Sequence, residues 1–431
     1  MRVAIYTLGC KVNQYETAAM EIELQRRGHT LTDFADVADA YIINTCSVTA
    51  VSDKKSRQMI RRAKKNNPQA IVAACGCYVQ THTQEAEGLG IDLIGGTGQR
   101  MAFLDLLEQA VAAEKCIVHV DEALRRREFE VLPSGGLASR TRAMLKVEDG
   151  CTNFCTYCII PYARGPVRSE SLADAVAQTA QLRDAGYREI VITGIEISSW
   201  GRDFKDGSAL IDLLEAVSAA AGEMRIRLGS LEPRTITDDF CRRAAALPNL
   251  CPHFHLSLQS GCDKTLREMH RKYDTARFFA SVELLRRYFD RPAITTDLIT
   301  GFPGESEEDF TQTLAFIEKC DFAAMHVFPY SIRPGTPAAK MVQVDMAVRE
   351  ERAHRAAAVA AQMHRQYLDG CVGRTYAVLF EQERGADYLG HAPNYMSVAV
   401  RGGEELHNRV LDVTITHTDG ETLYGVIREE N

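Results

Sequence analysis

Short apolar runs alternate with amphipathic stretches through the first quarter of the chain. Four runs have the length and apolar character of buried strands: residues 3–6, 40–43, 70–74 and 91–94. Helices are expected over 14–27, which ends at Gly28, and over 102–113. Strands that alternate with helices in this way predict a parallel, Rossmann-like sheet.

The same alternation resumes between residues 140 and 340. Six runs are candidate strands: residues 143–147, 189–193, 225–228, 254–258, 293–299 and 324–328. Helical stretches fill the gaps, such as 172–185 and one that begins at Ser306. Six units predict an open, partial (β/α) barrel, because a closed barrel needs eight. A long Ala-rich helix over 346–367 follows.

The last part of the chain has a strand-and-turn pattern. Its strand-like runs are residues 375–380, 395–400, 410–416 and 422–427. Gly and Asn between them predict a small antiparallel barrel of the OB-like kind. The whole pattern therefore predicts an α/β protein in four segments: an N-terminal parallel α/β domain (1–118), an exposed linker (119–138), a partial barrel (139–368) and a small β-barrel (369–431).

Composition narrows the class of protein. With 45% apolar and 25% charged residues among 431, the chain has enough apolar surface to fold. A net charge of −8 excludes a globally basic nucleic-acid binder but leaves room for a local basic patch. No apolar run approaches the roughly 18 residues of a membrane span, and the start does not resemble a signal peptide. We expect a cytoplasmic protein without a membrane partner, whose 13 cysteines favour metal or cluster ligation over disulfides.

Cys151, Cys155 and Cys158 form a C-x3-C-x2-C motif directly after the candidate strand 143–147. Three thiolates can hold three irons of a [4Fe–4S] cluster, which leaves the fourth iron open. An open iron can chelate the amino and carboxylate groups of S-adenosylmethionine, whose one-electron cleavage yields a 5′-deoxyadenosyl radical. Structural zinc is the alternative, but it prefers four protein ligands and the motif offers three.

The motif resembles that of the radical S-adenosylmethionine superfamily, and further segments resemble its methylthiotransferase branch. These are residues 7–14 (TLGCKVNQ), 44–49 (NTCSVT), 76–80 (GCYVQ), 255–261 (HLSLQSG), 296–305 (TDLITGFPGE), 328–331 (FPYS) and 333–337 (RPGTP). The resemblance implies S-adenosylmethionine as co-substrate and two [4Fe–4S] clusters. It also implies an external one-electron reductant and a sulfur donor.

Three cysteines of the N-terminal segment each follow a candidate strand: Cys10, Cys46, and either Cys75 or Cys77. Because strand ends of a parallel sheet meet at one edge, these thiols can converge, although independent buried cysteines are the alternative. The resemblance implies that three of them hold the second cluster, which carries or donates the inserted sulfur. The family pattern matches Gly76-Cys77-Tyr78, so Cys77 is the expected ligand and Cys75 a core residue.

Further site residues follow the barrel strands. Gly194 ends the second strand, where the absence of a side chain permits close approach of a ligand. The resemblance implies contact with the amino group of S-adenosylmethionine there, and Ser230, Glu232 and Gln259 hold comparable positions for its ribose or methionine. The stretch 95–98 (GGTG) lacks the spacing of a phosphate loop and is expected to be a turn.

Two features concern a nucleic-acid partner. Seven cations gather in one helix-like segment: Lys54, Lys55, Arg57, Arg61, Arg62, Lys64 and Lys65. In an acidic protein such a segment favours a polyanion such as RNA over an ordinary solvated face. The C-terminal segment resembles the RNA-binding TRAM module around 390–395, yet 371–431 carry five Arg against ten acidic residues, a net of −5. An acidic module suits shape recognition, stacking or docking better than phosphate binding.

Residues 11–17 and 44–49 resemble the methylthiotransferase class that acts on N6-threonylcarbamoyladenosine at position 37 of tRNA. The expected reaction is methylthiolation at C2, with the tRNA anticodon stem-loop as partner. The acidic C-terminal segment keeps methylthiolation of a ribosomal-protein aspartate as the runner-up, and isopentenyladenosine in tRNA is a further alternative. A non-catalytic iron–sulfur or zinc RNA-binding protein would not need the Gly-rich strand ends.

Overall fold

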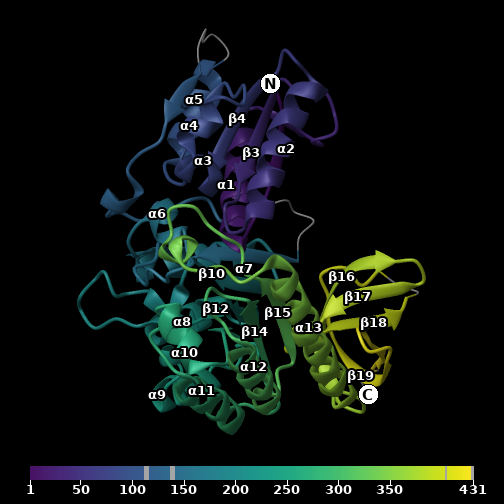
Figure 1. The fold of residues 1–431 in the computed structure, drawn as a ribbon. Coiled ribbons are helices and arrows are strands. Elements are labelled where there is room, and N and C mark those ends of the chain that lie inside the picture. Colours follow the sequence, from purple (N-terminus) through teal and green to yellow (C-terminus); the bar gives the residue numbers. More distant parts are fainter. Residues whose placement is uncertain (111–115, 136–140, 403–404, 429–431) are drawn as a thin grey trace.

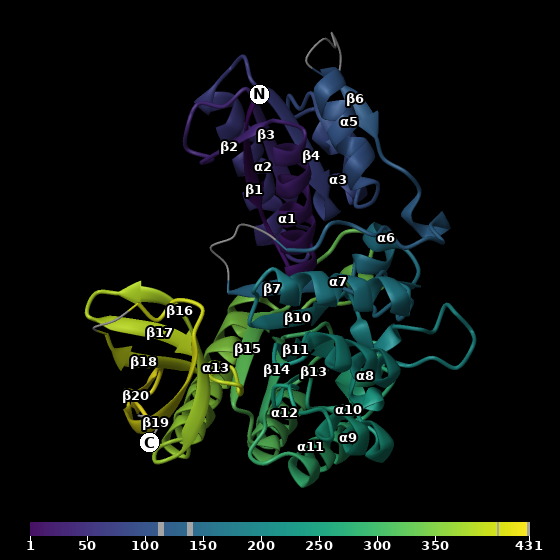
Figure 2. The ribbon, with the colours of Figure 1, turned by 180° about the vertical axis from the view of Figure 1, so that it is seen from behind.

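The computed structural model describes residues 1–110, 116–135, 141–402 and 405–428 (Figure 1). Along the chain they form a parallel sheet near the N-terminus, a partial barrel in the middle and a closed β-barrel near the C-terminus. The helix α13 (Met346–Asp369) lies between the partial barrel and the closed barrel (Figures 1 and 2). In the described part of the chain, no helix combines the length and apolar character needed to cross a membrane.

The N-terminal sheet is entirely parallel, in the order β2-β1-β3-β4-β5-β6. Its strands are β1 (Arg2–Thr7), β2 (Thr30–Thr32), β3 (Ala40–Thr45), β4 (Ile71–Gly76), β5 (Leu93–Gly95) and β6 (Ile117–His119). The helices are α1 (Lys11–Arg26), α2 (Ala50–Asn66), α3 (Cys77–Thr81), α4 (Thr83–Glu87) and α5 (Arg100–Ala110). The order of strand addition reverses between β1 and β3, and ligands of such sheets bind at this switch point.

Both faces of this sheet are buried, which explains why its strands are apolar throughout. Tyr41 and Ile43 pack on one face, whereas Ala40 and Ile42 pack on the other. The strands β2 and β6 were missed because each has only three residues and β6 lies at an edge. Positions 111–113 of the expected second helix lie outside the described residues.

The partial barrel consists of two parallel sheets, β11-β10-β7 and β12-β13-β14-β15. Its strands are β7 (Arg142–Lys146), β10 (Glu189–Thr193), β11 (Arg225–Leu228), β12 (Ser230–Leu231), β13 (His253–Gln259), β14 (Ala293–Thr300) and β15 (Ala324–Pro329). The helices are α6 (Ile160–Arg164), α7 (Leu172–Asp184), α8 (Leu210–Ala221), α9 (Asp238–Ala245), α10 (Asp263–Glu268), α11 (Thr275–Tyr288) and α12 (Glu307–Cys320). The six expected strands are present, so the prediction of an α/β fold with an open barrel is confirmed.

Alternation along these strands separates an apolar side from a polar side. Leu145, Ile190 and Phe254 belong to the large core shared with the helices. Polar residues hold several of the intervening positions, among them Lys146 and Arg227, both buried. The antiparallel pair β8 (Glu148–Asp149) and β9 (Arg168–Ser169) was not predicted, because each strand has only two residues.

The C-terminal barrel is closed, in the order β16-β17-β18-β20-β19, which confirms the predicted small β-barrel. It differs from the prediction in that β17 was missed and that β18 and β20 pair in parallel rather than antiparallel. Its strands are β16 (Thr375–Arg384), β17 (Asp387–His391), β18 (Ser397–Arg401), β19 (Val410–Thr418) and β20 (Leu423–Ile427). The loop after β17 packs against the starts of the core strands, where Arg227 donates to the carbonyl of Pro393 (2.8 Å). Tyr395 covers the same guanidinium, with its ring centroid 4.5 Å from Cζ of Arg227.

The expected linker is partly packed rather than wholly exposed. Ala123 and Leu132 are buried, and the hydroxyl of Tyr15 on α1 donates to the carbonyl of Leu132 (2.8 Å). Its last expected positions, 136–138, and the expected start of the next segment at 139 lie outside the described residues. The division into segments at 118, 138 and 368 stays a prediction.

Candidate active site

The barrel triplet, Cys151, Cys155 and Cys158, lies in the loop after β8. Cys155 is buried, and the other two thiols are half-buried. The loop begins at Gly150, whose φ is +93° and where an added Cβ would lie 2.0 Å from the carbonyl oxygen of Pro166. Only glycine fits that position, so the tight turn that leads into the motif has a steric cause.

Two other segments hold the same loop in place. The backbone N–H of Thr156 donates to the carbonyl of Met269 (3.1 Å), and the carbonyl of Thr156 accepts from Ala338 (2.9 Å). Arg271, which follows α10, donates from Nη1 to the Sγ of Cys155 (3.2 Å) and from Nε to the hydroxyl of Tyr273 (3.0 Å). Segments more than 100 residues away thus position the motif.

The N-terminal triplet, Cys10, Cys46 and Cys77, gathers at the ends of β1, β3 and β4. An added Cβ at Gly9 would lie 2.9 Å from the Sγ of Cys46, so the backbone before Cys10 touches that thiol. The pKa of Cys77 is raised to about 12, first by burial, although Arg164 opposes the shift. Cys10 and Cys46 contribute to this shift, which places all three thiols within electrostatic reach of one another.

Cys75 lies in a different environment. It is fully buried in the apolar core that also contains Ile42 and Phe103, on the sheet face that α5 covers. Burial raises its pKa to about 11, and its charged neighbours are Arg100, Glu16 and Arg164. The structure therefore places Cys77, and not Cys75, with Cys10 and Cys46.

Arg164, at the end of α6, lies beside the N-terminal triplet, and the carbonyl of the next residue, Gly165, accepts from the N–H of Cys151 in the barrel triplet (2.9 Å). Its fully buried guanidinium forms an ion pair with Glu16 and donates from Nη2 to the Oδ1 of Asn13 (2.7 Å). The charge of Arg164 opposes the rise in the pKa of Cys77, and the charge of Cys77 in turn contributes to the raised pKa of Cys158. The two triplets are therefore neighbours across the junction of sheet and barrel.

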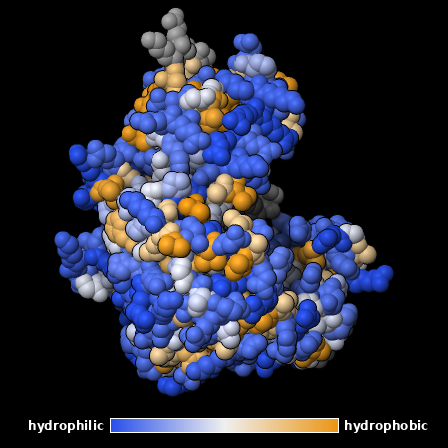
Figure 3. Space-filling view, in the orientation of Figure 1, coloured by the Kyte–Doolittle hydropathy of each residue, from blue (hydrophilic) through white to orange (hydrophobic). Residues whose placement is uncertain are grey.

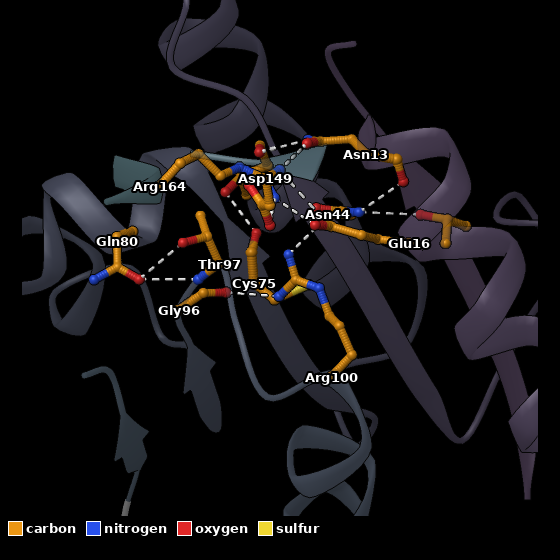
Figure 4. Close-up of polar contacts among 12 residues, drawn as sticks. Asn13, Glu16, Asn44, Cys75, Gln80, Gly96, Thr97, Arg100, Asp149 and Arg164 are labelled. Carbon is orange, nitrogen blue, oxygen red and sulfur yellow. Dashed lines mark hydrogen bonds and ion pairs between the residues drawn. The ribbon is translucent and has the colours of Figure 1, made fainter. Parts of the chain in front are cut away.

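A buried network of charges surrounds this arginine (Figure 4). Glu16 accepts from Arg100 (2.6 Å), and Asp149 lies 3.2 Å from the ammonium of Lys146. Burial alone would raise the pKa of Glu16, but Arg100 and Arg164 hold it below its usual value. With Arg168, 3.5 Å from Asp149, four cations face two carboxylates. The excess positive charge stabilises the thiolate form that iron requires.

Two acids that the sequence analysis missed lie beside Gly194. The N–H of Glu196 donates to the Oε2 of Glu148 (2.7 Å), and a Cβ at Gly194 would lie 2.8 Å from the same oxygen. The Oε1 atoms of both glutamates are buried and have no hydrogen-bond partner among the described residues. Burial, followed by neighbouring charges, raises the pKa of each carboxyl.

These orphaned oxygens lie near the barrel triplet, because the charge of Glu196 contributes to the raised pKa of Cys151. They fit the amino and hydroxyl groups of S-adenosylmethionine, which can donate to them. The sequence does mark these two acids: Glu148 follows shortly after β7 and Glu196 shortly after β10, at the strand ends where barrel active sites lie.

Of the other expected contact residues, only Glu232 lies near these two acids. Glu232 is buried near Glu196, but its carboxylate already accepts from Arg234 (2.8 Å). Ser230 is exposed on β12, and Gln259 ends β13 with a φ of +70°. The contacts of the described residues thus connect Gly194 and Glu232 to the two acids, but not Ser230 or Gln259.

The donor sets of the two triplets suit a cluster better than a single metal ion. Within the described ranges, no three His, Cys, Asp or Glu side chains lie close enough to hold a single metal ion. Each triplet instead offers three separated thiols, with Arg271 at one and Arg164 at the other. Three thiols beside a cation fit an iron–sulfur cluster that keeps one iron open.

Comparison with known proteins gives two family matches. The Radical SAM superfamily matches residues 145–317, and "Uncharacterized protein family UPF0004" matches residues 2–95. Each match contains one cysteine triplet.

Curated relatives match most of the chain. The chain is 40% identical over 421 residues to "Threonylcarbamoyladenosine tRNA methylthiotransferase MtaB" of Bacillus subtilis, covering 96% of this chain and 93% of that protein. The Aquifex aeolicus protein of the same name is 39% identical and covers 79% and 83%. The "tRNA-2-methylthio-N(6)-dimethylallyladenosine synthase" of Alkaliphilus oremlandii is 31% identical and covers 99% and 92%.

Solved structures share the fold. The radical S-adenosylmethionine methyltransferase TsrM of Kitasatospora setae superposes with a TM-score of 0.57 at 16% identity, covering 78% of this chain and 77% of that one. The cobalamin-dependent enzyme OxsB gives a TM-score of 0.53 at 11% identity, covering 83% and 55%. At these identities the likeness concerns the fold alone.

Proposed function

The chain belongs to the radical S-adenosylmethionine tRNA methylthiotransferase family, and we propose that it methylthiolates C2 of N6-threonylcarbamoyladenosine at position 37 of tRNA. Relatives named for threonylcarbamoyladenosine are 35–40% identical, whereas relatives named as dimethylallyladenosine synthases are 31–33% identical. The observation that carries the reaction type is the pair of adjoining cysteine triplets, in which Cys77 of one lies within electrostatic reach of Cys158 of the other. Because its substrate is tRNA, the protein is expected in the cytoplasm.

The enzyme uses S-adenosylmethionine and two [4Fe–4S] clusters. We assign the barrel triplet (Cys151, Cys155 and Cys158) to the cluster with the open iron and the N-terminal triplet (Cys10, Cys46 and Cys77) to the other. When bound, the first cluster supplies an electron for cleavage of S-adenosylmethionine, and the second supplies sulfur. An external reductant and a sulfur donor complete the proposed set of partners.

Cations beside the thiols oppose the rise in thiol pKa that burial causes. Arg271 donates to Cys155, and Arg164, which is held by Asn13 and Glu16, opposes the rise in the pKa of Cys77. Since each arginine is itself fixed by neighbouring groups, little reorganisation is needed during the reaction. The buried ion pairs cost desolvation, so their role here is positioning and electrostatics rather than stability.

Gly194, Glu148 and Glu196 form the proposed binding place for the methionine end of S-adenosylmethionine. The glycine leaves space beside the two carboxylates, whose free oxygens accept from an ammonium or a hydroxyl. Glu232, Ser230 and Gln259 follow the next strands and remain candidates for the ribose side. Burial raises the pKa of both carboxyl groups. A cation bound beside them, such as the ammonium of S-adenosylmethionine, would lower these pKa values and stabilise the carboxylates.

The exposed face of α2 is the proposed surface for the anticodon stem-loop. Of its seven cations, Arg57 is paired with Glu85 (3.2 Å) and Lys64 with Asp92 (2.7 Å). The other five are exposed and have no ion pair among the described residues: Lys54, Lys55, Arg61, Arg62 and Lys65. Since α2 begins four residues after Cys46, phosphates bound there would lie near the N-terminal triplet.

The test is reconstitution of the full chain with both clusters, S-adenosylmethionine, a reductant and sulfide. A stem-loop that carries threonylcarbamoyladenosine should gain the methylthio group, detected by nucleoside mass spectrometry. The same RNA with isopentenyladenosine is the matched control and should stay unmodified. Modification of a small-subunit ribosomal protein instead of either RNA would support the runner-up and contradict the proposal.

A further inference from the structure

The edge strand β15 has two contrasting faces. Met325 and Val327 pack into the large core with the helices. His326 and Phe328 lie on the other face and are both exposed, and Phe328 keeps 45% of its surface accessible. The ring centroids of these two residues are 6.3 Å apart, with 35° between the ring planes. Two neighbouring aromatic faces thus remain uncovered at the open side of the barrel.

Strand pairing places these rings beside the candidate active site. Phe328 is opposite Ile299 on β14, and Ile299 packs in a small apolar cluster with Tyr157 of the cysteine motif. His326 is opposite Asp297, which lies 3.4 Å from the imidazole of His255 on β13. The two rings therefore lie on the same face of the sheet as Asp297 and Ile299 of the neighbouring strand, and Ile299 belongs to the cluster that includes Tyr157.

The segment after β15 connects the two rings to α2, the basic helix that carries the seven cations. The N–H of Ala50, the first residue of α2, donates to the hydroxyl of Ser331 (3.0 Å), and Arg333 forms a buried ion pair with Asp53. Phe328 and Ser331 are three positions apart, a reach of at most about 10 Å. Lys54 lies about 6 Å further along the helix axis from Ala50. A few nucleotides can therefore span both features.

The surface around this connection is apolar within a hydrophilic surround. Figure 3 shows apolar side chains gathered at the junction between the N-terminal sheet and the barrel, where the green segment after β15 crosses in Figure 1. Exposed cations beside exposed ring faces are the combination that binds unpaired nucleotides, because phosphates pair with the cations and bases stack on the rings. An apolar protein segment would gain nothing from the unpaired cations of α2.

We infer that His326 and Phe328 form a stacking platform for an unpaired base of the RNA substrate, adjacent to the base that is modified. The inference rests on the proposed function, because it takes RNA as the occupant. It adds a base-binding place on β15, outside the cysteine triplets and the basic helix. Stacking tolerates any base, so the platform contributes affinity and placement rather than sequence readout.

The test uses the full chain with both clusters and an anticodon-type stem-loop. The RNA carries 2-aminopurine next to the target adenosine, so that stacking on protein quenches its fluorescence. Affinity is measured by anisotropy of the end-labelled RNA, and a blunt duplex of equal length serves as the second ligand. The variants are Phe328→Leu, which removes the ring, Phe328→Trp, which keeps one, and His326→Ala. Val342→Ala is the matched control, since Val342 is 88% exposed in the segment after β15.

Phe328→Leu should abolish the quench and weaken stem-loop binding by about 5- to 100-fold, the range of one lost stacking contact. His326→Ala should give a smaller loss, whereas Phe328→Trp and Val342→Ala should bind as wild type, and duplex binding should not change. A wild-type quench in Phe328→Leu, or an equal loss for the duplex, overturns the platform. If Phe328→Leu does not fold, a wild-type quench in His326→Ala together with lost binding in Phe328→Trp overturns it.

The same experiment separates the two proposals. Wild-type protein that quenches the probe but makes no methylthio nucleoside contradicts the proposed function and leaves the platform standing. Protein that makes the product while Phe328→Leu quenches normally contradicts the platform alone. Binding of a ribosomal protein through these rings, in place of the stem-loop, contradicts both.

Discussion

The Nη1 of Arg271 lies 3.2 Å from the Sγ of Cys155, within hydrogen-bond reach of a thiol in the cysteine motif. A donor to a cluster sulfur stabilises the more negative, reduced state and so raises the reduction potential. We expect Arg271→Gln to lower the potential of the barrel cluster by roughly 60 mV, the one-electron equivalent of a tenfold change. A redox titration followed by electron paramagnetic resonance measures the shift.

Arg242→Gln is the control for this shift, because Arg242 is an exposed arginine of α9. It should leave the potential unchanged. An unchanged potential in Arg271→Gln would show that the contact with Cys155 is only structural.

Cys75 and Cys77 are two positions apart but lie in different environments, so their substitution should affect the second cluster in opposite ways. Cys77→Ser should remove the second cluster, so that iron falls from about eight to about four atoms per chain. Cys75→Ser should keep both clusters, because Cys75 packs in the apolar core on the other side of β4. Both variants should still cleave S-adenosylmethionine in the presence of reductant. Loss of four irons in Cys75→Ser alone would reverse the assignment.

The ion pair between Arg333 and Asp53 joins the barrel to the N-terminal sheet, and its side chains are 3% and 11% exposed. Arg333→Met leaves a buried carboxylate without its partner, which should reduce the free energy of unfolding by about 3–5 kcal/mol. The double variant with Asp53→Asn should recover most of this loss. Urea unfolding of the cluster-free protein measures it.

An exposed ion pair provides the comparison for the Arg333 and Asp53 variants. Arg374 and Asp290 are paired at 3.0 Å, with 43% and 87% of their side chains exposed. Arg374→Met should cost no more than about 1 kcal/mol. Equal losses at the two sites would contradict a special role of the buried pair.

The raised pKa of Glu170 should make the free energy of unfolding depend on pH in the neutral range. Burial, followed by the charge of Asp174, raises its pKa to about 8, above the usual 4.5. Because the folded state holds this proton more tightly, its contribution is complete below pH 4.5 and is lost as the pH rises toward 8. Stability should fall by up to roughly 1.4 kcal/mol per pH unit within this window.

The matched variant is Glu170→Gln, which cannot ionise and keeps the shape of the side chain. Its free energy of unfolding should lose this slope, so the difference from wild type should grow between pH 5 and pH 8. A parallel pH profile in the two proteins would contradict the raised pKa.

The basic helix predicts how RNA binding depends on salt. Reversing Lys54, Arg61 and Lys65 to Glu should weaken stem-loop binding and reduce the slope of log K against log salt by roughly 0.7–0.9 per lost phosphate contact. The paired cations Arg57 and Lys64 are the controls, since their charges are already compensated by Glu85 and Asp92. Both clusters should be retained. An unchanged slope would exclude α2 as the phosphate surface.

The long elements were predictable because burial on one or both faces leaves a periodic pattern. The strands around Ile42 and Ile192 are apolar runs, and the closed C-terminal barrel follows from its regular turns. Strands of two or three residues, such as β8 and β9, were missed, because so few residues carry no period. The segment around Leu132 was expected to be exposed, yet it packs on Tyr15, which is 117 positions away.

The candidate site was predictable where one motif contains its residues and not where distant segments supply them. Cys151, Cys155 and Cys158 stand within eight positions. Arg164, by contrast, reaches Glu16 across 148 positions, and Arg271 reaches Cys155 across 116. No local pattern marks an arginine as the partner of a thiol when the two are brought together only by folding.

The most direct test of the central claim is nucleoside mass spectrometry of tRNA from a strain that lacks this protein. The account predicts that 2-methylthio-N6-threonylcarbamoyladenosine disappears and unmodified N6-threonylcarbamoyladenosine accumulates. The full chain should restore the methylthio nucleoside, whereas Cys155→Ala and Cys77→Ala should not. A deletion strain that keeps the methylthio nucleoside, while a ribosomal protein loses a methylthio-aspartate, would contradict the account.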